Sequence, residues 1–320
     1  MSVQKQRILV IKPSSLGDII HGLQVINSTR LHQPNTHITW VVADAFAPIV
    51  QACRAVDEVF IFERKGGARA LWRLLRAIRN SGRYDDVLDL QGLARSGLMT
   101  WAAKSNRKIG RTDAREGAGF FYDIKVPLPP FETAHAVEVL SQFLPALGLP
   151  VEIKSGLHFD LPIPEIALPS PLERAVLIFP ESRREEKNWP YFAECIHALQ
   201  KSHPEQSFVW CGSPASAANC PAGAKIYNAA GSTSLLDAIA LIQRAGAVIA
   251  NDSGPIHIAA AVGTPVLALF GPTPIEAYGP YPRDAKGHHA LRSEDGLMAS
   301  LSVDRVCQHF ESDLLPLFNC

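Results

Sequence analysis

The first residues that could do chemistry lie in a short polar loop near the N-terminus. The apolar run ILVIK (8–12) predicts a buried strand, and Pro13-Ser14-Ser15-Leu16-Gly17-Asp18 follows it at the start of a helical pattern. Because open α/β sheets carry their chemistry at the ends of the strands, we expect Asp18 at a ligand-binding edge. The helix dipole would keep its carboxylate ionised, as a general base requires. The simpler alternative is that Asp18 only caps the helix.

A second candidate loop follows the apolar run VLIF (176–179). It contains Ser182, Arg183 and Lys187 together with other charged residues, and it ends at Pro190, which we expect to begin the next helix. A hydroxyl, a guanidinium and an ammonium group at a strand end could bind a diphosphate. A solvated charged loop is the alternative.

A third candidate loop follows the run VIAN (248–251). Asp252, Ser253 and Gly254 stand where an alanine-rich helix begins, and His257 lies one turn later. Free backbone N–H groups at a helix N-terminus form an anion site. His257 could hydrogen-bond a phosphate or could pack as an ordinary helix residue. The run VLALF (266–270) leads to a further strand-end loop, Gly271-Pro272-Thr273. We expect this loop and the two before it, all in the second half of the chain, to converge on one edge of a sheet.

Several common motifs are missing from the sequence. No Gly-x-Gly-x-x-Gly follows a strand and no Gly-x-x-x-x-Gly-Lys-Ser/Thr occurs, which argues against a dinucleotide dehydrogenase and a P-loop enzyme. No Asp-x-Asp offers a carboxylate pair to a divalent metal, and none of the six cysteines forms Cys-x-x-Cys. We therefore expect neither a metal nor a cofactor.

The loops belong to two series of alternating strands and helices. Strands are predicted at 8–12, 38–42, 59–62, 87–90, 176–179, 208–211, 225–228, 248–251 and 266–270. Helices are predicted near 17–31, 45–54, 67–81, 93–103, 134–147, 190–202, 234–245, 254–262 and 302–311. Short buried strands joined by helices predict two doubly wound α/β domains. The proline-containing stretch 151–175 predicts an extended linker, so we place the domains at 1–160 and 161–320, facing a cleft.

The distribution of charge and hydropathy limits the kinds of partner that the protein can have. Residues 1–150 hold 19 Lys and Arg against 13 Asp and Glu, a formal charge of +6, which the remainder balances with −6. This asymmetry suggests an anionic partner for the first half. Within it, ARALWRLLRAIRN predicts an amphipathic helix, with Arg69, Arg73 and Arg76 suited to anionic headgroups or simply solvated. We find no signal-peptide pattern and no run near the roughly 20 apolar residues of a membrane span, and we expect a cytoplasmic protein.

The motifs together resemble those of the ADP-heptose:lipopolysaccharide heptosyltransferases, glycosyltransferase family nine, most like the heptosyltransferase I type. The resemblance rests on VIKPSSLGDIIH (10–21), DLQGLARSG (89–97), REGAGFFY (115–122), HAVE (135–138), EKNWP (186–190) and NDSGPIHIAAAVGTPVLALFGPT (251–273). It implies a GT-B fold and metal-independent, inverting transfer of L-glycero-D-manno-heptose from ADP-heptose. The implied acceptor is the inner core of lipopolysaccharide, as Kdo-lipid A or an already heptosylated core.

The resemblance also implies roles for individual residues. Asp18 resembles the catalytic base, Lys187 the lysine on the donor phosphate and Asp252 the carboxylate on the heptose hydroxyls. The donor-binding residues would be Ser182, Lys187, Thr233, Asp252, Ser253, Gly254 and His257. The acceptor-binding residues would be Ser15, Gly17, Arg64, Arg95 and Arg115. Residues 212–220 offer no carboxylate to a ribose, so the ribose partner stays open.

Other functions remain open from the residues alone. A GT-B transferase with another nucleotide sugar or acceptor is the nearest alternative. A non-catalytic two-lobed sugar-binding protein would not need a base at position 18. We expect no nucleic-acid partner. A lipid-linked acceptor implies transient contact with the inner leaflet and a peripheral position at the inner face of the inner membrane.

Overall fold

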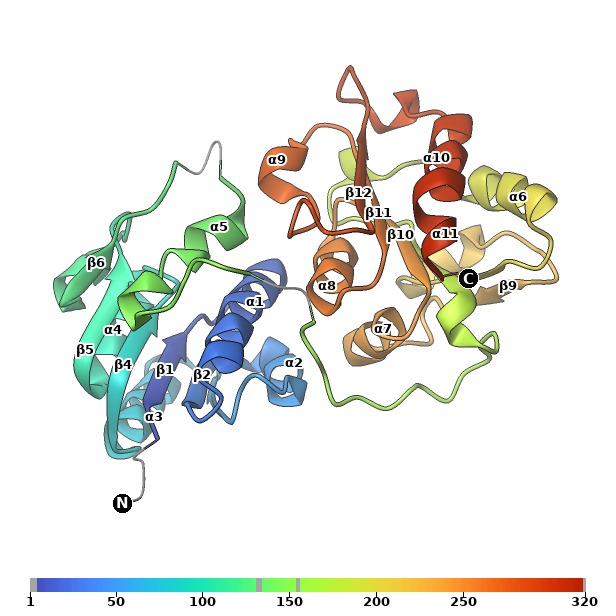
Figure 1. The fold of residues 1–320 in the computed structure, drawn as a ribbon. Helices are drawn as coiled ribbons and strands as arrows, with labels where there is room; N and C mark the ends of the chain where they lie inside the picture. Colours follow the sequence, from blue (N-terminus) through green and yellow to red (C-terminus); the bar gives the residue numbers. More distant parts are fainter. Residues whose placement is uncertain (1–4, 131–133, 154–155, 319–320) are drawn as a thin grey trace. The chain divides into compact units, whose positions relative to one another are not determined.

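The computed structural model describes residues 5–130, 134–153 and 156–318 of the chain (Figure 1). The chain forms two compact units, residues 1–160 and 161–320. Each unit is an α/β fold around one six-stranded parallel sheet. Among the described residues, no helix is long and apolar enough to cross a membrane.

The first unit has the strand order β3-β2-β1-β4-β5-β6. Its strands are β1 (Arg7–Ile11), β2 (His37–Ala43), β3 (Glu58–Phe62), β4 (Arg83–Asp89), β5 (Lys104–Arg111) and β6 (Ile124–Val126). Its α-helices are α1 (Leu16–His32), α2 (Ala47–Ala52), α3 (Gly67–Asn80), α4 (Ala94–Ala102) and α5 (Ala136–Ser141). Because strand order reverses beside β1, loops after β1 and β4 diverge to opposite faces and leave room for a ligand.

Successive side chains of a strand point to opposite faces of the sheet, so the first unit has apolar packing on both faces. Leu9 and Ile11 of β1 pack with Leu74 and Ile78 of α3, as the amphipathic pattern predicted. Trp40 of β2 points to the other face, where it abuts α1 at Gly22 and donates its indole N–H to the carbonyl of Lys12. The carboxyl end of β1, which leads into the loop of Asp18, is thus packed on both faces of the sheet.

The second unit repeats the same topology as β12-β11-β10-β7-β8-β9. Its strands are β7 (Ala175–Phe179), β8 (Ser207–Trp210), β9 (Ile226–Asn228), β10 (Ala247–Asn251), β11 (Val266–Phe270) and β12 (His288–Arg292). Its α-helices are α6 (Phe192–Ser202), α7 (Leu235–Ile242), α8 (Gly254–Val262), α9 (Ile275–Tyr278), α10 (Val303–His309) and α11 (Leu315–Phe318). The strands β7, β10 and β11 are buried at every residue, which explains their uninterrupted apolar runs.

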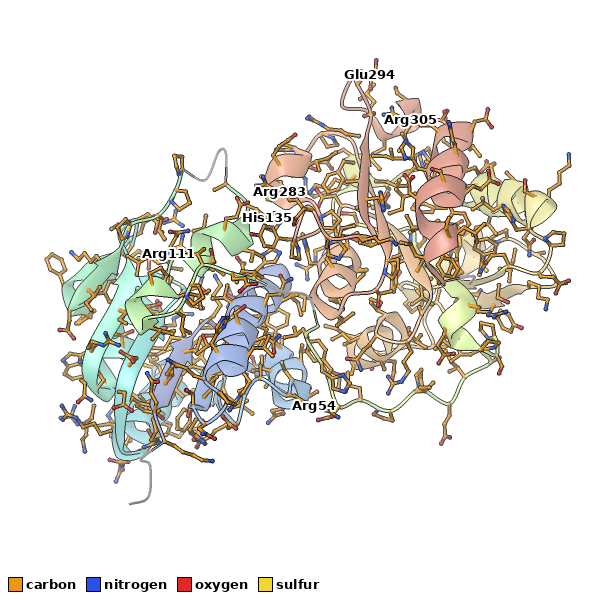
Figure 2. All side chains as sticks on the ribbon, in the orientation of Figure 1. Arg54, Arg111, His135, Arg283, Glu294 and Arg305 are labelled. Carbon is orange, nitrogen blue, oxygen red and sulfur yellow. The ribbon has the colours of Figure 1, made fainter. Side chains whose placement is uncertain are left out.

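The predicted linker contributes to both units. Residues 157–160 return to α2 of the first unit, where Phe159 pairs with Cys53 and Asp160 forms an ion pair with Arg54, labelled in Figure 2. From Leu161 the backbone belongs to the second unit, and the Leu161 carbonyl accepts a hydrogen bond from Arg244. The described part of 151–171 is otherwise largely irregular, as its prolines indicated.

Several sequence predictions need correction. The strands β5, β6 and β12 were not predicted, because polar residues such as Lys104 and Arg107 occupy the exposed half of β5. The helix predicted near 134–147 is interrupted, and residues Pro145–Leu147 form a separate 3₁₀ turn. The helix expected from Pro190 begins at Phe192, since Trp189 and Pro190 still belong to the preceding loop.

Candidate functional site

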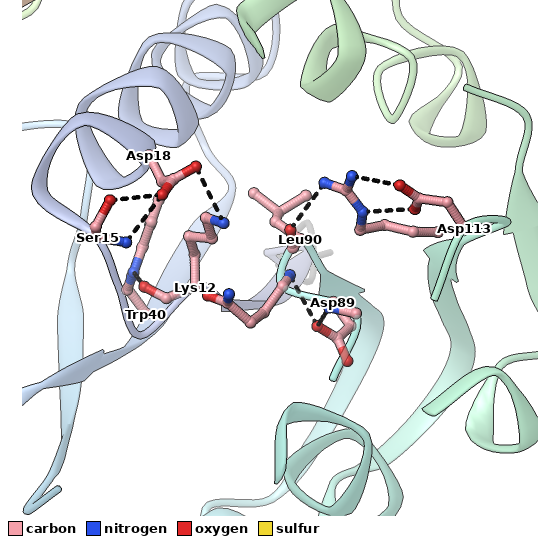
Figure 3. A network of polar contacts seen from close by, with 10 residues as sticks. Lys12, Ser15, Asp18, Trp40, Asp89, Leu90 and Asp113 are labelled. Atoms are coloured by element: carbon pink, nitrogen blue, oxygen red, sulfur yellow. Dashed lines mark hydrogen bonds and ion pairs between the residues drawn. The ribbon is translucent and has the colours of Figure 1, made fainter. Parts of the chain in front are cut away.

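The loop after β1 carries Asp18 in the first turn of α1. Its Oδ2 accepts hydrogen bonds from the Ser15 backbone N–H at 3.0 Å and from Ser15 Oγ at 2.7 Å. Lys12 Nζ lies 3.5 Å from Oδ1 of the same carboxylate (Figure 3). The Asp18 side chain is nevertheless 44% exposed. Asp18 therefore does cap the helix, and its carboxylate is also partly exposed to solvent.

Electrostatics at this loop favour the charged carboxylate. Burial alone would raise the pKa of Asp18, but the Lys12 ammonium and the hydrogen bonds from Ser15 outweigh it, so the pKa is lowered. Lys12 itself is buried, which lowers the pKa of its ammonium below the ordinary value. The sequence analysis missed Lys12, although a lysine ending an apolar strand directly before the loop is a usable signal.

The loop after β4 lies at the same carboxyl edge of the sheet as the loop after β1. Asp89 is fully buried and accepts hydrogen bonds from the backbone of Gln91 and Gly92. Arg111 at the end of β5 donates to the Leu90 carbonyl and holds Asp113 with two hydrogen bonds of 2.8 Å, as Figure 3 shows beside Asp113. These contacts give the loop a fixed shape.

Two of the predicted acceptor residues line one cavity in this unit. Arg64 and Arg95 border a space of about 350 Å³ together with Ser14, Phe62 and Glu116. The Arg95 guanidinium lies 5.4 Å from the centre of the Phe62 ring. An anion entering this cavity would meet two guanidinium groups at the carboxyl edge of the sheet.

The remaining acceptor predictions lie nearby. Ser15 and Gly17 belong to the capped start of α1, where Ser15 is the N-cap. Arg115 is exposed, and its backbone N–H donates to the Gly92 carbonyl in the loop after β4. Arg115 does not line the cavity of Arg64 and Arg95.

In the second unit, three strand-end loops meet at one carboxylate. Asp252 follows β10, and its Oδ2 lies 2.6 Å from Nζ of Lys187, which comes from the loop after β7. Thr273, from the loop after β11, donates its hydroxyl to the same oxygen. The Lys187 side chain is only 12% exposed, so the interpretation of Lys187 as a solvated lysine is wrong. The sequence analysis expected the loop of Thr273 at this edge, but not the hydrogen bond from Thr273 to Asp252.

Asn251 holds these loops in place. Its Oδ1 accepts a hydrogen bond from the Trp189 backbone and its Nδ2 donates to the Pro180 carbonyl. Asn188 Oδ1 in turn accepts from the backbone N–H of Ser182. The motifs EKNWP and NDSG are thus two sides of one hydrogen-bonded arrangement.

The N-terminus of α8 provides a second polar feature. Ser253 is its N-cap, yet the Ser253 Oγ is buried and has no hydrogen-bond partner within the part of the chain that is described. Gly254 begins the helix and His257 lies half-buried in its first turn. A buried unpaired hydroxyl beside free helix N–H groups suits an anionic ligand. Thr233 stands apart, immediately before the capping box of α7.

Two Rossmann-like units with polar clusters at their strand ends are the architecture of the GT-B fold, which glycosyltransferases share with other sugar-nucleotide enzymes. Residues 71–297 match the family model described as glycosyltransferase family 9 (heptosyltransferase). The Lipopolysaccharide heptosyltransferase 1 of Pseudomonas aeruginosa is 31% identical over 294 residues, covering 87% of this chain and 82% of that protein. The chain therefore belongs to glycosyltransferase family 9, the heptosyltransferases, and is an enzyme.

Solved structures confirm the fold. E. coli heptosyltransferase WaaC with ADP superimposes with a TM-score of 0.81 at 24% identity, covering 96% of this chain and 100% of that one. The same enzyme with ADP-2-deoxy-2-fluoro heptose gives a TM-score of 0.77, covering 96% and 99%. The predicted GT-B fold is thus confirmed.

Proposed function

We propose that this enzyme transfers L-glycero-D-manno-heptose, with inversion, from ADP-heptose to the Kdo-containing inner core of lipopolysaccharide. The observation that carries the proposal is the Lys187–Asp252–Thr273 cluster beside the α8 N-terminus, where Ser253 Oγ is buried without a partner. The Pseudomonas aeruginosa relative is a lipopolysaccharide heptosyltransferase by name, and the WaaC structures contain ADP and an ADP-heptose analogue.

In the proposed reaction, the oxygen of an acceptor hydroxyl attacks the anomeric carbon of the heptose. The bond from that carbon to the diphosphate oxygen breaks, and ADP leaves with the bonding electron pair. Asp18 takes the hydroxyl proton, a contribution of about 10²–10⁴-fold. Lys187 and the N-terminus of α8 stabilise the negative charge that grows on the diphosphate. Since Lys187 and Thr273 already occupy Asp252 Oδ2, we propose that no metal takes part.

Residues 1–160 would hold the acceptor and residues 161–320 the donor. The cavity between Arg64 and Arg95 fits a Kdo carboxylate or a phosphate, and Ser15, Gly17 and Arg115 would border the same acceptor. The donor diphosphate would lie against Ser182, Lys187, Ser253, Gly254 and His257, with heptose hydroxyls on Asp252 and the adenine near Thr233.

Incubation of the purified chain with ADP-heptose and a heptose-free Kdo-lipid A tests the function. We expect release of ADP and a product heavier by one heptose in mass spectrometry. A parallel assay with an already heptosylated core separates the first transfer from the second. Turnover of a GDP- or UDP-sugar in place of ADP-heptose would support the alternative of another GT-B transferase. Specific sugar binding without turnover of any donor would support the non-catalytic sugar-binding protein.

A lipid-linked acceptor further implies contact with the cytoplasmic face of the inner membrane, and we propose that α3 and α4 together form the surface for it. Trp72 and Trp101 are 60% and 54% exposed. The Arg76 guanidinium lies 5.5 Å from the centre of the Trp72 ring, and that of Arg79 lies 6.0 Å from that of Trp101. Tryptophan with arginine suits the headgroup region of an anionic bilayer.

Vesicle sedimentation tests this surface. We expect the chain to bind phosphatidylethanolamine vesicles that contain phosphatidylglycerol, more weakly at high salt, and the double variant Trp72→Ala/Trp101→Ala to bind several-fold more weakly. Leu297→Ala removes an exposed apolar side chain elsewhere and serves as the control. Equal binding by wild type and the tryptophan variant would exclude this surface of α3 and α4 from the contact.

A further inference from the structure

The second unit lacks a carboxylate where its fold would place one. In sheets with this strand order, the phosphates of a nucleotide lie at the loop after the first strand, and a carboxylate from the end of the second strand binds the ribose hydroxyls. Here β7 and β8 are those two strands. The stretch after β8, residues 211–220, contains neither Asp nor Glu.

A carboxylate reaches this position from the neighbouring loop. Glu181, directly after Pro180 in the loop behind β7, accepts a hydrogen bond from the Ser213 backbone N–H at 2.7 Å with Oε2. Its Oε1 accepts another from Ser213 Oγ at 2.8 Å. The Glu181 carboxylate thus lies at the end of β8 although its backbone belongs to the end of β7.

Gly212 makes room for this carboxylate. A Cβ atom at Gly212 would lie 2.6 Å from Glu181 Oε2, and the φ of +147° disfavours any other residue. The absence of a side chain at Gly212 and its backbone conformation therefore both leave space for the Glu181 carboxylate.

We propose that Glu181 binds the ribose hydroxyls of the donor nucleotide, in place of a carboxylate from the β8 loop. This inference rests on the proposed function, in which residues 161–320 hold a nucleotide sugar. A carboxylate offers about four lone-pair sites, of which Ser213 uses two, and two remain for a ribose diol. Glu181 is half-buried and lines a pocket of about 490 Å³ with Asn188 and Ser216.

The position of Glu181 relative to the phosphate cluster supports this role. The carbonyl of Pro180, its neighbour, accepts a hydrogen bond from Asn251, and Asn251 precedes Asp252. Glu181 is thus tied to the Lys187–Asp252 ion pair through one side chain. In a nucleoside diphosphate the ribose adjoins the diphosphate, so both groups can be bound from one loop.

Calorimetry with deoxynucleotides tests the proposal on the full chain. The probes are ADP, 2′-deoxy-ADP and 3′-deoxy-ADP, titrated into wild type, Glu181→Gln and the exposed control Glu185→Gln. We expect wild type and the control to bind at least one deoxy compound about ten- to a hundredfold more weakly than ADP. Glu181→Gln should bind ADP more weakly and lose most of that preference for ribose, since a neutral amide accepts less strongly.

The outcome separates a ribose contact from a purely structural one. A structural tie between the two loops would weaken ADP and deoxy-ADP equally and leave the ratio of their affinities at the wild-type value, which would overturn the proposal. The same titrations with GDP and dGDP and with UDP and dUDP distinguish the two levels of inference. Loss of ribose preference in Glu181→Gln with UDP or GDP but not with ADP would refute the ADP donor and retain the ribose contact. Binding of none of the three nucleotides by wild type would refute both.

Discussion

Lys187 and Asp252 form an ion pair between two loops of the second unit, with 2.6 Å between Nζ and Oδ2 and side chains that are 12% and 6% exposed. Thr273 donates to the same oxygen, and the Tyr278 ring centre lies 5.9 Å from Nζ. A buried pair of this kind contributes less to stability than its geometry suggests, because both charges lose their hydration. Its position at three strand ends is better explained by ligand binding.

Replacement of this lysine should affect both binding and chemistry. We expect Lys187→Ala to weaken ADP binding and to lower kcat, by about ten- to a hundredfold in kcat/KM, because charge on the diphosphate grows as the glycosidic bond breaks. Lys187→Arg should restore activity only in part, since a planar guanidinium does not replace a compact ammonium. Calorimetry and steady-state kinetics measure the two effects.

Arg184→Ala is the matched control for Lys187→Ala. Arg184 lies in the same loop but is 57% exposed, and it pairs with Glu186 on the surface. Because Lys187→Ala leaves Asp252 without its cation, circular dichroism must first show that the variant is folded at the assay temperature. Unchanged affinity and kcat in folded Lys187→Ala would place the donor phosphates elsewhere.

Asp18→Asn should nearly abolish transfer while ADP affinity stays within a few fold of wild type. The amide keeps the size of the side chain and can still accept from the Ser15 N–H, but it cannot take the acceptor proton. The expected loss in kcat is about 10²–10⁴-fold. Rapid-quench measurement of a single turnover tests the chemical step directly, and wild-type turnover by the pure variant would exclude Asp18 as the base.

Activity should be complete in excess EDTA. The cationic and hydrogen-bonding groups proposed for the leaving diphosphate are Lys187 and the start of α8, and Asp252 is already engaged by Lys187 and Thr273. Transfer rates are compared before and after chelation, with magnesium or manganese added back. A rate that falls with EDTA and recovers with either ion would contradict the metal-free mechanism.

The sequence predicted the central part of each sheet better than its margins. Buried strands such as β7 and β10 are apolar throughout, so their composition reveals them. In contrast, β5 begins with Lys104 and carries Arg107, which pairs with Asp86 of β4. Its own sequence does not resemble a buried strand, and only its pairing with β4 in the folded sheet defines it.

The candidate site shows the same limit at the level of single residues. Asp18 was identifiable because its loop, helix start and carboxylate are contiguous in sequence. The contacts of Thr273 with Asp252 and of Glu181 with Ser213 join residues 21 and 32 positions apart. No local pattern encodes them, since they depend on which strands become neighbours in the sheet.

Gly110→Ala should destabilise the first unit. A methyl group at Gly110 of β5 would lie 2.2 Å from the Tyr122 ring, whose hydroxyl donates to buried Asp89 at 2.7 Å. Overpacking of this kind costs about 1–3 kcal/mol in the free energy of unfolding. Gly119→Ala is the control, because its Cβ would contact only Lys125, at 3.6 Å. Denaturant titration measures both, and equal midpoints would mean that the ring moves aside without cost.

The pH dependence of transfer should reveal the Lys12–Asp18 pair. Removal of the ammonium in Lys12→Met leaves burial, which raises the pKa of Asp18, without the main cause that lowers it. We therefore expect the acidic limb of kcat/KM to lie below the ordinary pKa of an aspartate in wild type and to move to higher pH in Lys12→Met. Methionine fills the space of the buried lysine stem without a charge.

The free energy of unfolding should also depend on the pKa of Asp18. A carboxyl group with a lowered pKa stabilises the folded state above its unfolded pKa of about 3.9, and this contribution is lost as the pH falls through the folded pKa. In Lys12→Met the folded pKa of Asp18 is higher, so the stability that its ionised carboxylate adds above the unfolded pKa should be smaller than in wild type. Kinetics and denaturant titrations across the acidic range measure both effects, with the exposed Lys201→Met as control. An acidic limb at the same pH in wild type and Lys12→Met would show that Lys12 does not set the protonation of Asp18, or that Asp18 is not the group whose ionisation transfer requires.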